Sequence, residues 1–178
     1  MFITLERFIE EKYIKKFNLE KISKKKKKIY SKYKNDFDKK KFISKFANNI
    51  NEGFIEKVIK DRKNKFLLYC LDNTTIDYNH ICSIVIYRKV MDYKDKVRYV
   101  IFILAVKPTL RGNGYGKLTL NNLLLHLNKK KLNEIVLHSI KSSYEFYIKN
   151  GFIEIHKNYF IEKYEGIHDN FILMKKIF

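Results

Sequence analysis

The chain has 178 residues, of which 46% are hydrophobic, and it carries a formal net charge of +19. A chain of this length buries roughly 70% of its unfolded surface, which suits a single domain with one sizeable core. Its apolar runs are shorter than the roughly 18 residues that span a membrane, and no signal-peptide pattern is present, so we expect an intracellular protein, cytoplasmic or nuclear, without membrane contact.

Residues 1–65 are basic and helical in pattern. They hold 21 Lys or Arg against 9 Asp or Glu, a net charge of +12. Apolar residues recur at helical intervals, and only residues 2–5 resemble a strand. A basic region of this kind is a candidate for nucleic-acid or ribosome contact. Because Lys and Asn are abundant along the whole chain, a solvated surface is the competing interpretation.

Three strands are predicted next, over residues 66–71, 81–90 and 97–106, with polar turns at 72–75 and 92–95. Cys70 and Cys82 lie in the first two of these apolar segments and show no metal-ligand spacing. We therefore expect two buried, reduced thiols and no metal site.

A glycine-rich turn follows the third strand and precedes an amphipathic helix over residues 118–127. The first N–H groups of such a helix lack intrahelical partners and favour an anion. Glycines there permit positive φ and remove the Cβ atoms that would keep a phosphate from the backbone. The turn lacks the Gly-Lys-Ser/Thr of a nucleoside triphosphatase, and it predicts a pyrophosphate site. Its residues are Arg111, Gly112, Asn113, Gly114, Tyr115, Gly116 and Lys117.

The last third predicts a strand at 134–139, a helix from about 144 that ends at Gly151, and a closing strand at 171–176. Three adjoining strands followed by alternating helices and strands predict an α/β fold with a mixed, mainly antiparallel sheet. We expect parallel pairing between the strands at 97–106 and 134–139. If those two strands are splayed apart, they leave a cleft.

Two of these motifs resemble one family. Arg111-x-x-Gly114-x-Gly116 is similar to the (Q/R)-x-x-G-x-(G/A) signature of the GNAT superfamily of acetyl-CoA-dependent N-acetyltransferases, and Tyr147-x-x-x-Gly151-Phe152 is similar to its Y-x-x-x-G-F segment. The resemblance covers about residues 66–178. It implies the GNAT fold, acetyl-CoA as cosubstrate, coenzyme A as product and a pyrophosphate held by the turn.

The resemblance also implies roles for single residues. Tyr147 is the candidate acid that protonates the departing thiolate, and it contributes to the cofactor site. Leu104 and Val106 would lend backbone groups to the pantetheine arm or the acetyl carbonyl. For each side chain the alternative is an ordinary packing residue.

The general base is less clear, because many members of the family carry a glutamate on the central strand and residues 97–106 contain no carboxylate. Tyr99 and His138 are the candidates. They resemble a pair that holds a water in protein N-terminal acetyltransferases, although the interval from His138 to Tyr147 is three residues shorter. Tyr159 and Phe160 are similar to a segment that grips the substrate in those enzymes; an ordinary strand is the alternative.

The sequence thus predicts an N-acetyltransferase in which a primary amine attacks directly, the acceptor being a protein N-terminus or a lysine. One alternative is a small-molecule enzyme acting on an aminosugar or a polyamine, and the net charge disfavours a polycation. Another is a non-catalytic acetyl-CoA-binding module with a basic docking arm. We expect residues 1–65 to pack on the substrate side of a core at 66–178, as one domain. The sequence leaves the oligomeric state open.

Overall fold

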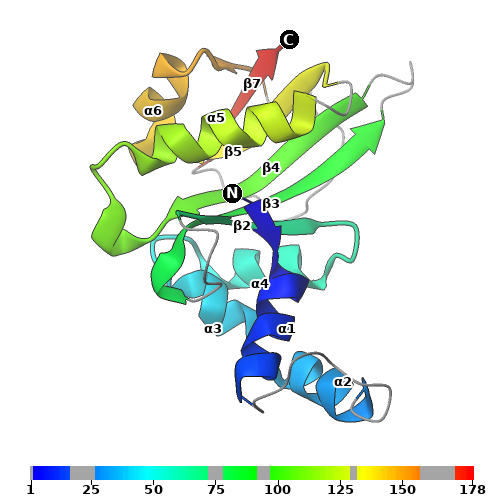
Figure 1. The fold of residues 1–178 in the computed structure, drawn as a ribbon. Helices are drawn as coiled ribbons and strands as arrows, with labels where there is room; N and C mark the ends of the chain where they lie inside the picture. Colours follow the sequence, from blue (N-terminus) through cyan, green and yellow to red (C-terminus); the bar gives the residue numbers. More distant parts are fainter. Residues whose placement is uncertain (1, 17–26, 72–77, 92–96, 129–131, 157–170) are drawn as a thin grey trace.

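The computed structural model describes residues 2–16, 27–71, 78–91, 97–128, 132–156 and 171–178. Within these residues the strands form one seven-stranded sheet in the order β1-β2-β3-β4-β5-β7-β6 (Figure 1). Every neighbouring pair is antiparallel except β4 and β5, which are parallel as the sequence predicts. The strands are β1 (Phe2–Thr4), β2 (Lys65–Cys70), β3 (Ile81–Met91), β4 (Val97–Val106), β5 (Glu134–Ile140), β6 (Ile153–Glu154) and β7 (Phe171–Ile177).

Helices cover both faces of the sheet (Figure 1). The N-terminal helices lie on one face and form a core with Ile84 and Phe102, while the two later helices lie on the other face and form a second core with Val85 and Tyr99. The helices are α1 (Leu5–Lys16), α2 (Lys27–Asp36), α3 (Lys39–Ser44), α4 (Glu52–Lys60), α5 (Tyr115–Asn128) and α6 (Tyr144–Lys149).

The short strand β1 precedes α1 and pairs with β2, with Ile3 opposite Leu68. It uses three of the residues at 2–5 that resemble a strand in the sequence. The helical pattern that overlaps it begins at Leu5, the first residue of α1. The strand pattern and the helical pattern are therefore both realised, the strand at residues 2–4 and the helix from Leu5.

The parallel ladder between β4 and β5 is short. It runs from the pair Arg98 and Glu134 to the pair Ile101 and Leu137, although both strands continue beyond it. Opposite Ile86 and Tyr87 the partners on β4 are Ile103 and Ile101, so Phe102 is an extra residue at a β-bulge. A bulge bends its strand and increases the local twist. The expected splay between the two strands therefore begins where β4 bulges.

Helix α5 is fixed to the sheet at a buried polar contact as well as by its apolar face. The hydroxyls of Ser83 on β3 and Thr119 on α5 lie 2.8 Å apart, and both residues are buried. Because each hydroxyl satisfies the other, neither is left unpaired in the core. This contact fixes the start of α5, and with it the loop that precedes the helix.

Neither Cys70 nor Cys82 forms a disulfide and both are buried, as the sequence predicts. Burial raises the pKa of the Cys82 thiol to about 11, which keeps it protonated and a weak nucleophile. Across the described parts of the chain, no helix combines the length and the apolar character that crossing a membrane requires.

Candidate active site

A cleft of about 330 Å³ opens between β4 and β5 beyond the last pair of their ladder. Residues 101–106 of β4 line one wall and residues 137–140 of β5 line the other. Helix α6 contributes Phe146 and Tyr147, the loop before it contributes two serines, and the start of α5 contributes Gly116. Three further lining residues come from distant parts of the chain: Asn49, Ile50 and Phe171.

Backbone groups of β4 face this cleft. The N–H of Lys107 donates to the Cys82 carbonyl on β3 at 2.8 Å, so the alternation of an antiparallel ladder turns the backbone groups of Leu104 and Val106 the other way. Both residues line the cleft. The structure thus places Leu104 and Val106 where they can pair with an extended ligand lying along the edge of β4.

The carboxyl end of β4 is followed by a short 3₁₀ turn, Pro108–Leu110, and then by the glycine-rich turn, which leads directly into α5. Gly112 and Gly114 have φ angles of 81° and 77°, a conformation that favours glycine. A Cβ added at either residue would meet no protein atom within 4 Å, so their outer side is open. Open backbone before the N–H groups of α5 fits the diphosphate of coenzyme A.

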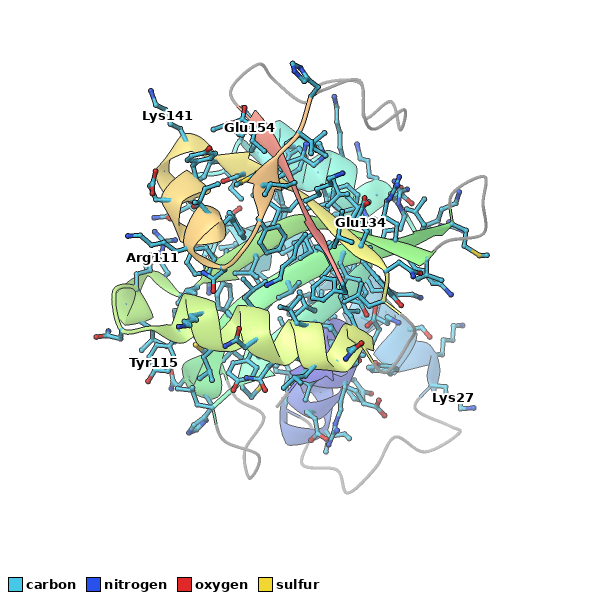
Figure 2. All side chains as sticks on the ribbon, turned by 90° about the horizontal axis from the view of Figure 1, so that it is seen from above. Lys27, Arg111, Tyr115, Glu134, Lys141 and Glu154 are labelled. Carbon is cyan, nitrogen blue, oxygen red and sulfur yellow. The ribbon has the colours of Figure 1, made fainter. Side chains whose placement is uncertain are left out.

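At Gly116 a Cβ would lie 3.4 Å from Cε2 of Phe146, which is an ordinary van der Waals contact between the first turn of α5 and α6. Tyr115 begins α5, and Asn113 in the turn donates through its side chain to the Arg111 carbonyl at 3.3 Å. Figure 2 labels Arg111 and Tyr115 near the same end of α5.

The two cations of the turn are placed differently. Lys117 is exposed on the first turn of α5. The Arg111 guanidinium instead donates to the carbonyls of Val106 and Phe46 and to the side chain of Asn48. Arg111 is therefore engaged with protein acceptors, and Lys117 is the exposed cation beside the open backbone of the turn.

Tyr147 lines the cleft from the face of the sheet that carries α5 and α6. Its side chain is 6% exposed and packs between the rings of Phe146 and Phe152, whose centroids lie 5.0 and 5.5 Å from its own. Burial raises the pKa of the Tyr147 hydroxyl far above its ordinary value. The hydroxyl is therefore held neutral, with a proton to give.

His138 lines the same cleft from the opposite face. Its neighbour Leu137 belongs to the core under α5, so the alternation along β5 points His138 toward the N-terminal helices. The ring meets Phe171 edge-on at 6.5 Å, and Phe171 lies 5.5 Å from Phe54 of α4. Burial lowers the pKa of the His138 imidazole to about 4, so the ring is neutral near pH 7.

Tyr99 is not brought together with His138. It lies in the core under α5, 2% exposed, with its ring 5.9 Å from that of Tyr87. Its hydroxyl is buried without a hydrogen-bond partner among the described residues, and it does not line the cleft. The expectation that Tyr99 and His138 hold one water between them is not supported by this placement, because the two side chains occupy opposite faces of the sheet.

Two further predicted residues, Tyr159 and Phe160, lie outside the described residues. The cleft also contains residues that sequence reasoning missed. Ser142 and Ser143 precede α6 directly, next to a motif that the sequence does show. Asn49 and Phe171 carry no such signal, because only the folding of the chain brings them to the cleft.

The splayed strands and the open glycine turn at the carboxyl end of β4 are the geometry expected of an α/β protein that binds a diphosphate-bearing ligand. A family model described as "Acetyltransferase (GNAT) domain" matches residues 19–168, and the chain belongs to this GNAT acetyltransferase family. The protein is an acyltransferase with acetyl-CoA as its cosubstrate, as the sequence predicts.

Solved structures share this fold. Tetrahymena GCN5 has a TM-score of 0.58 at 19% identity, covering 88% of this chain and 92% of that one. A GNAT acetyltransferase from Elizabethkingia anophelis with acetyl-CoA bound has a TM-score of 0.52 at 19% identity, covering 76% and 88%. The NatC complex bound to Gag peptide and CoA has a TM-score of 0.53 at 14% identity, covering 77% and 88%. At these identities the likeness concerns the fold alone. No curated protein matches the sequence.

The open side of Gly114 gives a first prediction. Gly114→Ala should weaken coenzyme A binding about tenfold or more, since the added methyl group projects toward the diphosphate position. Calorimetric titration with coenzyme A measures the effect.

Gly151→Ala is the matched control, because Gly151 has a φ of 80° at the end of α6, so an alanine there carries the same strain of about 1–2 kcal/mol, and its Cβ meets only the flexible end of Lys176 at 3.3 Å. Its coenzyme A affinity should stay within about twofold of wild type. Equal losses of affinity in the two variants would mean that backbone strain, and not the methyl group, disturbs the site.

Proposed function

We propose that the protein acetylates a primary amine by direct attack, with a protein N-terminus or a lysine side chain as acceptor. The observation that carries the proposal is the placement of Tyr147 and His138. These side chains line one cleft from opposite faces of the sheet, one held neutral with a proton to give and the other held neutral and able to accept one.

Acetyl-CoA supplies an activated acetyl thioester, whose carbonyl is open to an amine and whose sulfur leaves as a thiolate. The backbone N–H groups of the glycine turn and the first turn of α5 would hold its diphosphate, with Lys117 adding charge. Leu104 and Val106 would pair with the pantetheine arm, which completes the edge of β4 where β5 turns away.

Tyr147 acts as the general acid in this proposal. Transfer requires a proton at the sulfur, and a positioned side chain that provides one contributes about 10²–10⁴-fold to the rate. Tyr147 lines the cleft from the α6 face, and its ring is fixed between Phe146 and Phe152. Burial keeps the Tyr147 hydroxyl protonated near neutral pH, so its proton is present when the thiolate forms, and the tyrosinate that remains regains a proton from solvent when coenzyme A leaves.

His138 acts as the general base. A primary amine is protonated near neutral pH and must lose a proton before or as it attacks. His138 faces the side of the sheet that carries the N-terminal helices, away from Tyr147, so the two proton transfers need not compete for one group. An imidazole with its pKa lowered to about 4 is neutral over the whole physiological range, and one of its two ring nitrogens is available to accept a proton.

The lining of the cleft supports the choice of acceptor. Apart from Arg111, the described lining residues are uncharged, and no carboxylate is among them. A polyamine carries several positive charges that this lining would desolvate without compensation, in a protein of net charge +19. A single amine at a chain terminus or at the end of a lysine side chain brings one charge, which it loses when the proton is taken.

Acetylation of a peptide array with labelled acetyl-CoA tests the acceptor class. We expect label on peptides that carry a free α-amino group or a lysine, and no label on the same peptides with both amines blocked. Turnover confined to aminosugars or polyamines offered in parallel would refute the peptide acceptor while leaving acetyl transfer intact.

The acid role gives a second kinetic test. Tyr147→Phe should lower kcat by about 10²-fold or more, with the affinity for acetyl-CoA nearly unchanged, because only the proton donor is removed. Tyr144→Phe is the matched control: it removes a hydroxyl from the same helix one turn earlier, at a residue that does not line the cleft. An unaltered kcat in Tyr147→Phe would take this residue out of the mechanism.

The base role predicts both a rate and a pH effect. His138→Gln should lower kcat at pH 7 by about 10²-fold. The folded pKa of about 4 lies below the ordinary value of 6.5, so between these pH values the unfolded chain binds more protons than the folded one. The free energy of unfolding of the wild type should therefore rise with pH in this window, and His138→Gln should flatten that rise.

Denaturant titrations at pH 4.5 and pH 7, together with steady-state kinetics, measure the two effects. His126→Gln is the control, because His126 lies on α5 against Phe2 and away from the cleft. If His138→Gln turns over at the wild-type rate, another group removes the proton.

A further inference from the structure

Arg111 joins three segments of the chain that are far apart in sequence. Its Nε donates to the Val106 carbonyl at the end of β4 at 3.1 Å. Its Nη2 donates to the Phe46 carbonyl at 2.7 Å and to Asn48 Oδ1 at 3.0 Å. A single guanidinium therefore connects the β4 edge and the glycine turn to the segment after α3, more than 60 residues earlier in the chain.

The segment at 45–51 forms part of the cleft. Asn49 and Ile50 line it on the side of the N-terminal helices, the side to which His138 also points. The segment starts from buried Phe46 and ends at Asn51, whose side chain caps α4 by accepting from the N–H of Gly53 at 2.8 Å. Its middle is exposed, and Arg111 contacts it there through Asn48.

We propose that Arg111 is a positioning residue that couples the glycine turn to the 45–51 segment, so that coenzyme A in the turn orders the wall against which the acceptor amine binds. When the diphosphate fixes the turn, it also fixes the backbone of Arg111. The guanidinium then keeps its hydrogen bonds to the Phe46 carbonyl and to Asn48. Asn49 and Ile50 are thereby held at the cleft. The inference rests on the proposed placement of coenzyme A in the turn.

An arginine suits this task better than a lysine. The contacts use two nitrogens of one rigid planar group, which a lysine ammonium on a flexible stem cannot reproduce in the same geometry. The alternative is that Arg111 binds the diphosphate directly, as a cation in such a turn does in general. To do so it would have to release the Phe46 carbonyl, which lies just beyond the last turn of α3 where carbonyls lack helical partners.

Hydrogen exchange of the full chain, with and without coenzyme A, tests the coupling. In the wild type, coenzyme A should slow exchange of the amides at 46–50 by about fivefold or more, the range of ordinary coupling between sites. In Arg111→Lys, coenzyme A should still bind by calorimetry, but the slowing at 46–50 should fall below about twofold. Arg98→Lys is the matched control, because Arg98 pairs with Glu134 at the far end of β4, and it should keep the wild-type pattern.

Variants of Asn48 provide a second, independent test of the coupling, because this residue is exposed and should tolerate substitution. Asn48→Ala should reduce the slowing at 46–50, whereas Asn48→Asp should preserve it, because a carboxylate accepts the same hydrogen bond with added charge. If Arg111→Lys does not fold, as judged by thermal unfolding, these two variants decide the question.

The outcomes separate this inference from the proposed function. Full protection at 46–50 in coenzyme A-bound Arg111→Lys overturns the coupling and leaves acetyl transfer untouched. Loss of coenzyme A binding in folded Arg111→Lys also overturns it, since Arg111 would then hold the phosphate itself. A wild-type protein that binds no coenzyme A would overturn the cofactor turn, and both proposals with it.

Discussion

The end of the parallel ladder at Ile101 and Leu137 is the constraint on which the rest of the site depends. Up to that pair, β4 and β5 satisfy each other's backbone groups. Beyond it, the groups of β4 that face β5 have no strand partner, and the Val106 carbonyl accepts from Arg111 instead. Buried backbone groups need partners, so a protein keeps such an edge only where a ligand or water completes it. The bulge at Phe102 bends β4 at the same place, and the cleft, the glycine turn and the start of α5 all follow within the next 15 residues.

The two hydrophobic cores lie on opposite faces of the sheet, and each supports different residues of the site. The core under α5 and α6 holds Tyr147 and supports the turn through the contact of Ser83 with Thr119. The core under the N-terminal helices holds the ring of Phe102 and faces His138. A ligand in the cleft passes between these cores, so its two ends meet different surroundings. In the proposed function, the face that carries α5 and α6 supplies the acid and the face that carries the N-terminal helices supplies the base.

Much of this could be predicted from the sequence, for identifiable reasons. The apolar run at 97–106 gave the bounds of β4, and the glycines marked the turn because positive φ restricts the choice of residue. The apolar pattern predicts the start of α5 at Leu118, three residues after its first residue Tyr115, because the first turn of the helix contributes no apolar period. An unbroken apolar run has no alternation, so it could not show that Tyr99 and His138 face opposite sides. Arg111 donates to the backbone carbonyl of Phe46, and a backbone acceptor cannot be inferred from the type of residue that carries it.

Desolvation acts in one direction on every group that takes part in the proposed chemistry. Burial raises the pKa of Tyr147 and lowers that of His138, which favours the neutral form of each. The same lining lowers the pKa of an amine that enters it, because the ammonium is the charged form and no described lining residue offers it a carboxylate. The cleft thus shifts the acceptor toward the form that attacks, and this reduces what is required of the base. Because the pKa of the amine is lowered, a weakly basic imidazole can accept its proton. A glutamate on the central strand is then not required.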